Sequence, residues 1–264
     1  MGKIYCIIGK SATGKDTIYK TIKKEHDEIV PVITYTTRPK REGEKEGEEY
    51  HFVSYEQFLN CEKNELILEQ RKYDTVYGEW VYFTVKFNFE ENKNYLLLTT
   101  IEGATAIQDY YGENNVIVIC LTALGKTRLL RSINRQEKVL EGKVYEEICR
   151  RFLADEKDYD SKKLMHFKNL FFIYNEEELH CAIEAWNDIY EKTNKKSYKN
   201  LSVFTNDYKG YIGSIETDNT NDLLYGHIQD ISEVVTYYAK TMNNLEKAFH
   251  DAVDSYEDTL KNTK

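Results

Sequence analysis

Short apolar runs alternate with amphipathic segments through the first three quarters of the chain. Continuous apolar runs predict buried strands at residues 3–8, 95–98, 116–121 and 171–174. Apolar residues at helical spacing, or charged helical patterns, predict helices at residues 15–24, 124–137, 144–159 and 176–191. Strands that alternate with helices predict an α/β fold, in which a parallel sheet is covered on both faces.

The pattern changes near Thr193. Residues 194–206 are polar and lack an apolar period, which predicts a linker. Beyond them, strand-like segments occur at residues 208–216, 223–228 and 234–238. Thr241 can then cap a helix that carries a continuous apolar face. We therefore expect a domain at 1–193, a linker at 194–206 and a small α+β (βββα) domain at 207–264.

Charge and cysteine content narrow the class of protein. The net charge is −9, and residues 207–264 contribute eleven acidic and five basic side chains to it. A protein this acidic is a poor candidate for non-specific binding to nucleic acid or anionic membranes. Its apolar runs are too short for a membrane-spanning helix. The five cysteines are scattered without metal-ligand spacing, so we expect reduced thiols and a cytoplasmic protein.

A glycine-rich segment follows the first predicted strand and precedes the first predicted helix. It reads Gly9, Lys10, Ser11, Ala12, Thr13, Gly14 and Lys15. The spacing G-x-x-x-x-G-K in this context predicts a phosphate-binding loop for ATP. Glycines let backbone N–H groups surround phosphate oxygens, and the helix N-terminus adds positive potential. Lys15 is the expected catalytic cation for the transferred phosphoryl group.

The residue after Lys15 departs from the usual pattern. A Ser or Thr normally binds Mg²⁺ there, whereas this chain has Asp16 followed by Thr17. A carboxylate is a good Mg²⁺ ligand but repels phosphate. Either Asp16 or Thr17 binds the metal, or nucleotide affinity is lowered.

Residues 36–52 carry a second anion-binding pattern. Arg38 and Arg41 lie three residues apart behind a Thr-Thr pair, and Tyr50 follows. Two guanidinium groups and a phenol can hold a phosphate dianion through charge-assisted hydrogen bonds. A solvated charged loop would explain the acidic residues of this segment but not the two arginines.

This segment resembles the guanylate kinase signature at Thr36, Thr37, Arg38, Arg41, Glu44, Gly47, Tyr50 and Phe52. The resemblance implies a P-loop NTPase fold of three layers with lid and acceptor-binding lobes. It also implies Mg²⁺-assisted phosphorylation of GMP or dGMP by ATP. By resemblance, the acceptor phosphate is held by Arg38, Arg41, Tyr50 and Tyr77. Glu69 would accept hydrogen bonds from guanine N1 and N2, and Thr34 would contact the base.

Five arginines fall on the two predicted helices after residue 121: Arg128, Arg131, Arg135, Arg150 and Arg151. Phosphoryl transfer needs cations around a charged transition state. The resemblance implies catalytic roles for Arg131, Arg135 and Arg151. The alternative is solvated arginines paired with Glu146, Glu147 or Asp155. Asn175 resembles a family Asn near the donor adenine.

Other departures leave two further functions open. Glu79 stands where the family usually has Ser, and Leu98 and Thr100 stand where it commonly has acids, although Glu102 can compensate. One alternative is a related P-loop kinase with another acceptor, such as ribose bisphosphate. The other is a degenerate kinase domain that senses nucleotide and is fused to a partner-binding module.

The C-terminal segments resemble the HicB-like antitoxin fold at residues 207–216, 224–227 and 245–256. The resemblance implies self-association or binding of a toxin-like protein partner. Family members often carry a DNA-binding segment after the helix, and this sequence stops at Lys264. We therefore expect no DNA binding.

Overall fold

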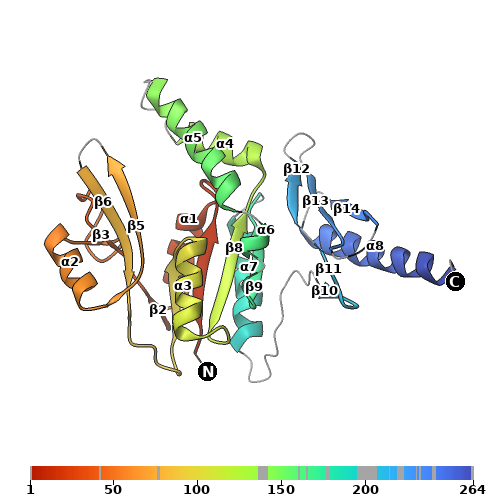
Figure 1. The fold of residues 1–264 in the computed structure, drawn as a ribbon, viewed down its shortest axis with the longest axis horizontal. Coiled ribbons are helices and arrows are strands. Elements are labelled where there is room, and N and C mark those ends of the chain that lie inside the picture. Colours follow the sequence, from red (N-terminus) through yellow and green to blue (C-terminus); the bar gives the residue numbers. More distant parts are fainter. Residues whose placement is uncertain are drawn as a thin grey trace. The chain divides into compact units, whose positions relative to one another are not determined.

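A computed structural model gives the fold of the 264-residue chain (Figure 1). The described residues are 2–41, 43–75, 78–135, 142–159, 161–164, 166–176, 179–194, 207–213, 215–218, 223–229, 231, 233–239 and 242–262. The chain divides into two compact units. The first comprises Met1–Ile8, Lys15–Ile119 and Phe167–Asn169, and the second comprises Gly9–Gly14, Cys120–His166 and Leu170–Lys264.

The central sheet has five strands in the order β2-β7-β1-β8-β9. Their bounds are β1 Ile4–Gly9, β2 Ile29–Pro31, β7 Asn94–Leu98, β8 Val116–Thr122 and β9 Leu170–Tyr174. β7 pairs in parallel with both β1 and β2. Every residue of β1 is buried, as expected for a strand covered on both faces. The predicted strands and the parallel α/β class are confirmed.

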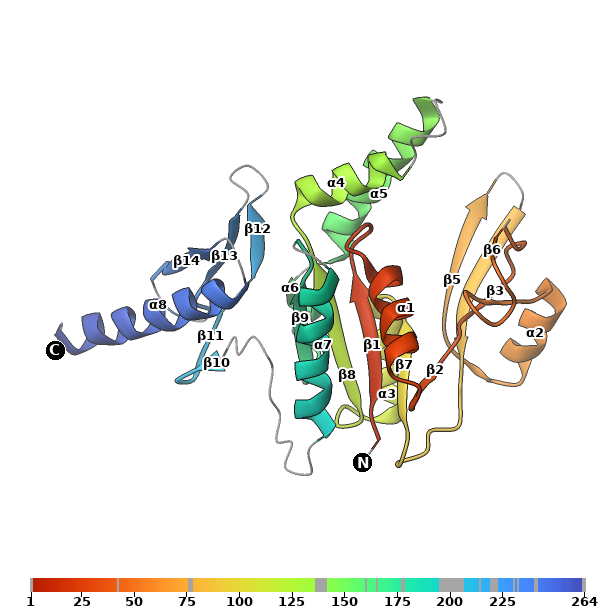
Figure 2. The same cartoon turned by 180° about the vertical axis from the view of Figure 1, so that it is seen from behind.

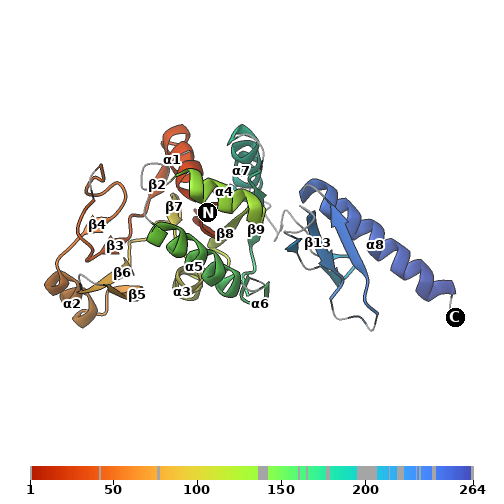
Figure 3. The same cartoon turned by 90° about the horizontal axis from the view of Figure 1, so that it is seen from above.

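Two helices of the first unit cover opposite faces of this sheet (Figures 2 and 3). They are α1, Lys15–Glu25, and α3, Ile101–Tyr111. α1 buries Ile18, Tyr19 and Ile22, the side that its apolar spacing predicts. α3 begins at Thr100, whose side chain accepts a hydrogen bond from the Gly103 N–H and so caps the helix.

A second sheet of the first unit has the order β4-β3-β6-β5. Its elements, with the helix that follows β4, are β3 Tyr35–Thr36, β4 His51–Phe52, α2 Tyr55–Lys63, β5 Ile67–Thr75 and β6 Gly78–Val85. Phe58 of α2 packs with Val81 and Phe83 of β6 in a small core. Ser54 and Gln57 form a capping box at the start of α2. We call this group of elements the acceptor lobe.

In the second unit, β8 leads into two charged helices. These are α4, Gly125–Asn134, and α5, Gly142–Asp158, followed by α6, Ser161–Leu164, and α7, Leu179–Asn194. The helix predicted from residue 176 begins at Leu179 in the structure. Glu176 has another role, because its carboxylate accepts hydrogen bonds from the Leu124 N–H and the Thr127 hydroxyl.

The C-terminal residues form strands and one long helix with their own core. The elements are β10 Asp207–Tyr208, β11 Tyr211–Ile212, β12 Glu216–Asp218, β13 Leu223–His227, β14 Thr236–Ala239 and α8 Met242–Asn262. The expected continuous strand at 208–216 is wrong. Lys209 and Gly210 have φ of 54° and 82°, which turns the chain into the β10–β11 hairpin. β12, β13 and β14 form an antiparallel sheet, and Leu245 and Phe249 of α8 belong to the core.

Some predictions fall outside the described residues or concern membranes. Of the linker predicted at 194–206, Asn194 is instead the last residue of α7, and residues 195–206 lie outside the described residues, as does the helix cap at Thr241. Among the helices that the structure describes, every one is too short or too polar to cross a membrane. The five cysteines, all of which lie in the described part of the chain, form no disulfide bond, and Cys6 and Cys120 are buried.

Candidate active site

The predicted phosphate loop has the backbone that a tight anion-binding turn requires. Ala12 and Gly14 have φ of 63° and 94°. A Cβ on Gly9 would lie 2.5 Å from the carbonyl oxygen of Leu121, so this position accepts only glycine without a shift. The Asn175 side chain donates to the Thr13 carbonyl at 2.8 Å and would collide with a Cβ on Gly14. Asn175 therefore stabilises the conformation of the loop through this hydrogen bond.

Two groups from the end of α5 and the residue after it occupy N–H donors of the loop. The Ser11 N–H donates to a carboxylate oxygen of Asp155 at 2.6 Å. The Gly9 N–H donates to the Tyr159 hydroxyl at 2.8 Å. The Asp155 oxygen stands where an anionic ligand would accept the same bond, so it acts as a substitute for a phosphate oxygen.

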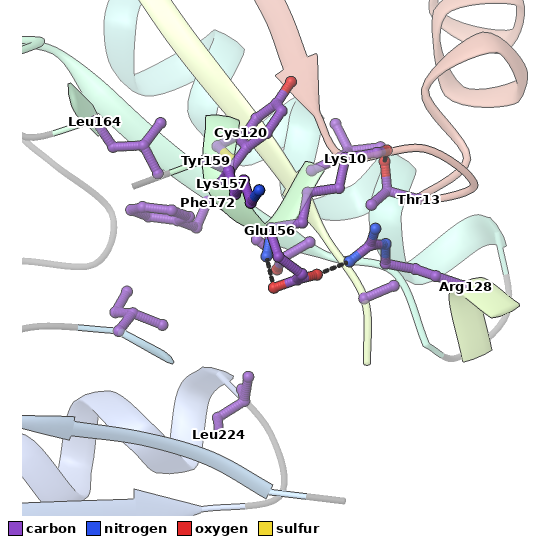
Figure 4. Close-up of a pocket in the computed structure, with 14 residues that line it drawn as sticks. Lys10, Thr13, Cys120, Arg128, Glu156, Lys157, Tyr159, Leu164, Phe172 and Leu224 are labelled. Atoms are coloured by element: carbon purple, nitrogen blue, oxygen red, sulfur yellow. Dashed lines mark hydrogen bonds and ion pairs between the residues drawn. The ribbon is translucent and has the colours of Figure 1, made fainter. Parts of the chain in front are cut away.

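A charged cluster extends from this contact (Figure 4). Glu156 lies between Lys10 and Arg128, at 2.6 Å and 2.8 Å. Arg128 is 3% exposed and also donates to the Ser11 carbonyl at 3.0 Å. Burial opposes ionisation of Glu156, but hydrogen bonds from Lys10 and Arg128 lower its pKa overall. The sequence shows Arg128 among the arginines, but only the structure reveals its contact with the loop.

The arginines of α4 and α5 other than Arg128 have different surroundings. Arg135 and Arg151 line a small cavity together with Ser11 and Ala12, as a role at the phosphates requires. Arg131 has a buried guanidinium nitrogen, Nη1, with no hydrogen-bond partner among the residues that the structure describes.

One acidic side chain of α5 holds two of these arginines. Arg150 and Arg151 both donate to Glu147 at 2.6 Å, and these bonds lower the pKa of Glu147 to about 2. The sequence left open the alternative that helix arginines pair with acidic side chains, and such pairs occur at Glu147.

Asp16 and Thr17 differ in what they face. Asp16 lines a cavity with Thr34, Tyr50 and Leu98 in the first unit. Both residues are exposed, but Thr17 is absent from that lining. No group of three His, Cys, Asp or Glu side chains with metal-ligand geometry occurs among the described residues. One carboxylate at the edge of a cavity fits Mg²⁺, because this ion usually takes one or two protein carboxylates together with phosphate oxygens and waters.

The phosphate end of the acceptor lobe centres on Arg38, which is 3% exposed. Its guanidinium donates to the Tyr82 hydroxyl at 3.1 Å and to both carboxylate oxygens of Glu44 at 3.0 Å and 2.8 Å. These bonds to Arg38 lower the pKa of Glu44. Burial raises the pKa of the nearby Tyr50 hydroxyl. Arg41 is exposed, and its N–H also donates to Glu44.

The base end contains Glu69, whose side chain is 7% exposed. One carboxylate oxygen accepts a hydrogen bond from the Thr84 hydroxyl at 2.8 Å. The other oxygen, and the Thr99 hydroxyl, are buried without a hydrogen-bond partner in the described part of the chain. A Cβ on Gly103 would lie 3.5 Å from the Glu69 carboxyl carbon and would collide with Thr99. Glu69 therefore lies in a buried, polar recess in which a side chain at position 103 would collide with Thr99.

The departures from the expected family pattern also have structural roles. Thr100 caps α3, and Leu98 lines the cavity that contains Asp16. Glu79 accepts a hydrogen bond from the Tyr55 hydroxyl at 3.1 Å and lies 3.7 Å from the Lys72 ammonium. Tyr77, the fourth expected phosphate ligand, lies outside the described residues.

Comparison with known proteins agrees with this geometry. The family model described as guanylate kinase matches residues 1–161. The chain is similar to a guanylate kinase of Clostridioides difficile, with 31% identity over 76% of this chain and 94% of the relative. It is also similar to a guanylate kinase of Thermotoga maritima, with 30% identity over 53% of this chain and 69% of the relative.

The chain is also similar to a solved guanylate kinase structure. The guanylate kinase of Anaplasma phagocytophilum has a TM-score of 0.47 and 23% identity, over 74% of this chain and 88% of that one. The family of the chain is established by the sequence matches. They cover the phosphate loop, the acceptor lobe and most of the arginine-bearing helices, and the chain belongs to the guanylate kinase family.

Proposed function

We propose that this protein phosphorylates GMP, or dGMP, with ATP and Mg²⁺ to give the nucleoside diphosphate and ADP. The proposal rests on one face of the acceptor-lobe sheet, which carries both Glu69 and Tyr82. Cross-strand register sets Glu69 opposite Thr84, and Tyr82 lies two residues before Thr84 on the same strand face. Tyr82 accepts a hydrogen bond from Arg38. A carboxylate that can read guanine and a guanidinium that can hold phosphate therefore share one surface.

The base end supports guanine as the acceptor base. Guanine presents an N–H and an NH₂ side by side, and one carboxylate can accept from both. Adenine lacks that pair of donors, so it would leave the second oxygen of Glu69 buried without a hydrogen bond. Unpaired buried polar groups give strong discrimination between substrates. Thr34 lines the cavity that contains Asp16 and Tyr50, which is consistent with a contact to the acceptor nucleotide.

The phosphate loop supplies the donor site. Its N–H groups and Lys15 would hold the ATP phosphates, with Asp155 displaced from Ser11. Arg135 and Arg151 line the cavity beside the loop and would stabilise charge on the transferred group. We propose the same role for Arg131, because its guanidinium has a buried nitrogen without a hydrogen-bond partner among the described residues. No side chain is required as a strong base, because positioning and electrostatics carry phosphoryl transfer.

For the metal, we propose Asp16 as the protein ligand in preference to Thr17. Both side chains are exposed, but Asp16 lines the cavity that contains Thr34 and Tyr50, and Thr17 does not. Mg²⁺ would supply charge neutralisation at the phosphates when bound. Calorimetric titration of Mg²⁺ into the ADP complex of the protein should show weaker binding for Asp16→Asn and unchanged binding for Thr17→Val.

A coupled assay of ADP release tests the main proposal. GMP, dGMP, AMP, UMP and ribose bisphosphate are offered separately with Mg·ATP. Turnover with GMP or dGMP alone is the expected result. Turnover only with ribose bisphosphate would identify a different kinase of this fold. GMP binding by calorimetry without turnover would identify a nucleotide sensor.

The C-terminal residues support a separate proposal. We propose that residues 207–264 are a HicB-like domain that binds a protein partner or a second copy of the chain, joined by a linker at 194–206. The β12–β13–β14 sheet with α8 and its own core is consistent with this fold. Light scattering of the full chain would detect self-association. We expect a cytoplasmic protein.

A further inference from the structure

Arg71 is a cation of the acceptor lobe that has no role in the function proposed above. Arg71 lies on β5 two residues after Glu69, so both side chains project from the same face of the sheet. Its cross-strand partner is Tyr82, the residue whose hydroxyl binds Arg38. Arg71 therefore lies between the proposed base end and the proposed phosphate end of one surface.

The contact between Arg71 and Glu69 is close but incomplete. The Arg71 Nε lies 3.3 Å from the Glu69 Oε2, and both atoms are buried. Neither makes a hydrogen bond of acceptable geometry among the described residues. Buried polar atoms without hydrogen bonds cost free energy, so a ligand that supplies those bonds gains affinity. The Arg71 side chain is 27% exposed and can move aside when a ligand enters.

The surroundings of Arg71 favour a ligand acceptor over a permanent ion pair. The Glu69 carboxylate already receives a hydrogen bond from Thr84 on its other oxygen. Burial raises the pKa of Tyr50, and the positive charges of Arg71 and Arg38 oppose that rise, so both guanidinium groups lie near the Tyr50 hydroxyl. A cation here would meet whatever acceptor group the bound nucleotide presents beside Glu69.

We propose that Arg71 determines base specificity by donating to guanine O6 while Glu69 accepts from N1 and N2. This inference rests on the proposed function. Guanine O6 adjoins N1 on the same edge of the base, so a donor beside the Glu69 carboxylate lies on the correct side to reach it. Arginine donates readily to guanine O6. Adenine carries an amino donor at the same position, which Arg71 would repel.

The test measures kcat/KM for three acceptors with the full chain: GMP, IMP and 6-thio-GMP. IMP keeps N1–H and O6 but lacks the 2-amino group. 6-thio-GMP keeps N1–H and the amino group but has sulfur, a weaker acceptor, at position 6. Arg71→Ala should lower kcat/KM for GMP and IMP equally, by roughly tenfold or more. It should lower kcat/KM for 6-thio-GMP much less, so the GMP to 6-thio-GMP ratio falls toward one while the GMP to IMP ratio stays constant.

Two results would overturn the proposal. An equal loss for all three nucleotides would make Arg71 a phosphate ligand. A collapse of the GMP to IMP ratio would make it only a support for Glu69. Arg71→Lys should behave like Arg71→Ala in the sulfur ratio if the planar guanidinium is needed. Lys72→Ala, the neighbouring cation, which lies over the Phe58 ring, is the matched control and should leave all ratios unchanged. Failure of the proposed function is separate, because wild-type protein would then not turn over GMP.

Discussion

The phosphate loop and the acceptor lobe both bring cations and buried polar groups together, but they satisfy them differently. In the loop, the chain supplies its own anions, because Asp155 accepts from Ser11 and Glu156 pairs with Lys10. In the acceptor lobe, Glu69 keeps a buried oxygen without a hydrogen bond in the part of the chain that is described. Under the proposed function, ATP would therefore displace internal partners, whereas the acceptor base would gain bonds that the protein leaves unmade.

This difference has a consequence for binding energy. A ligand that replaces an internal hydrogen bond gains only the difference between the two bonds. A ligand that satisfies a buried, unpaired group removes a penalty of about 1–3 kcal/mol. We therefore expect substitutions at the base end to have larger effects than substitutions of the internal anions at the loop.

The largest expected effect follows from Glu69→Gln. An amide presents a donor to the two guanine donors, and two bonds to a charged group are weakened or lost. Each such bond contributes about 1.5–3 kcal/mol, so kcat/KM for GMP should fall roughly a hundredfold or more. KM for ATP should not change. Glu62→Gln on α2 is the control, and an equal loss in both variants would contradict the assignment of Glu69.

A smaller loss is expected for Arg41→Met, which tests the phosphate end of the same surface. The exposed Arg41 side chain can donate to the acceptor phosphate without supporting the fold. KM for GMP should rise about tenfold to a hundredfold, with ATP binding unchanged by calorimetry. Lys40→Met provides the control for loss of one nearby positive charge. Weakened ATP binding in Arg41→Met would show that the acceptor phosphate site is misplaced.

Asp155→Asn tests the other side of the comparison and should improve binding. The substitution removes the anion that competes for the Ser11 N–H, and the net value of one such bond is about 0.5–1.5 kcal/mol. ATP should bind roughly three- to tenfold more tightly by calorimetry, with KM for GMP unchanged. Asp158→Asn, on the exposed end of α5, is the control. Weaker ATP binding in Asp155→Asn would mean that Asp155 supports the loop instead of competing for it.

The smallest effect concerns pH and the Arg38–Glu44 pair. Hydrogen bonds from Arg38 lower the pKa of Glu44 below the usual value of a glutamate side chain. The pair therefore stabilises the fold at pH above the unfolded pKa, and this contribution is lost as pH falls through the folded pKa. Thermal unfolding midpoints of wild type and Glu44→Gln should differ at neutral pH and converge in acid. A constant difference across the pH range would show that the charge of Glu44 is irrelevant.

The sequence by itself determined the fold class, the phosphate loop and the family. Buried strands such as residues 116–121 are continuous apolar runs, and the loop requires glycines at fixed spacing, so both leave a local pattern. The roles of Arg38, Arg41 and Glu69 follow from the resemblance and remain predictions.

The tertiary structure decided the features that depend on contacts between distant residues. The strands of the acceptor lobe are short or polar on the face that carries Glu69 and Arg71, so apolar periodicity does not reveal them. Asp155 meets Ser11 across 144 positions of sequence, and Arg128 meets it across 117. No local pattern encodes such pairs, because packing of the elements brings them together.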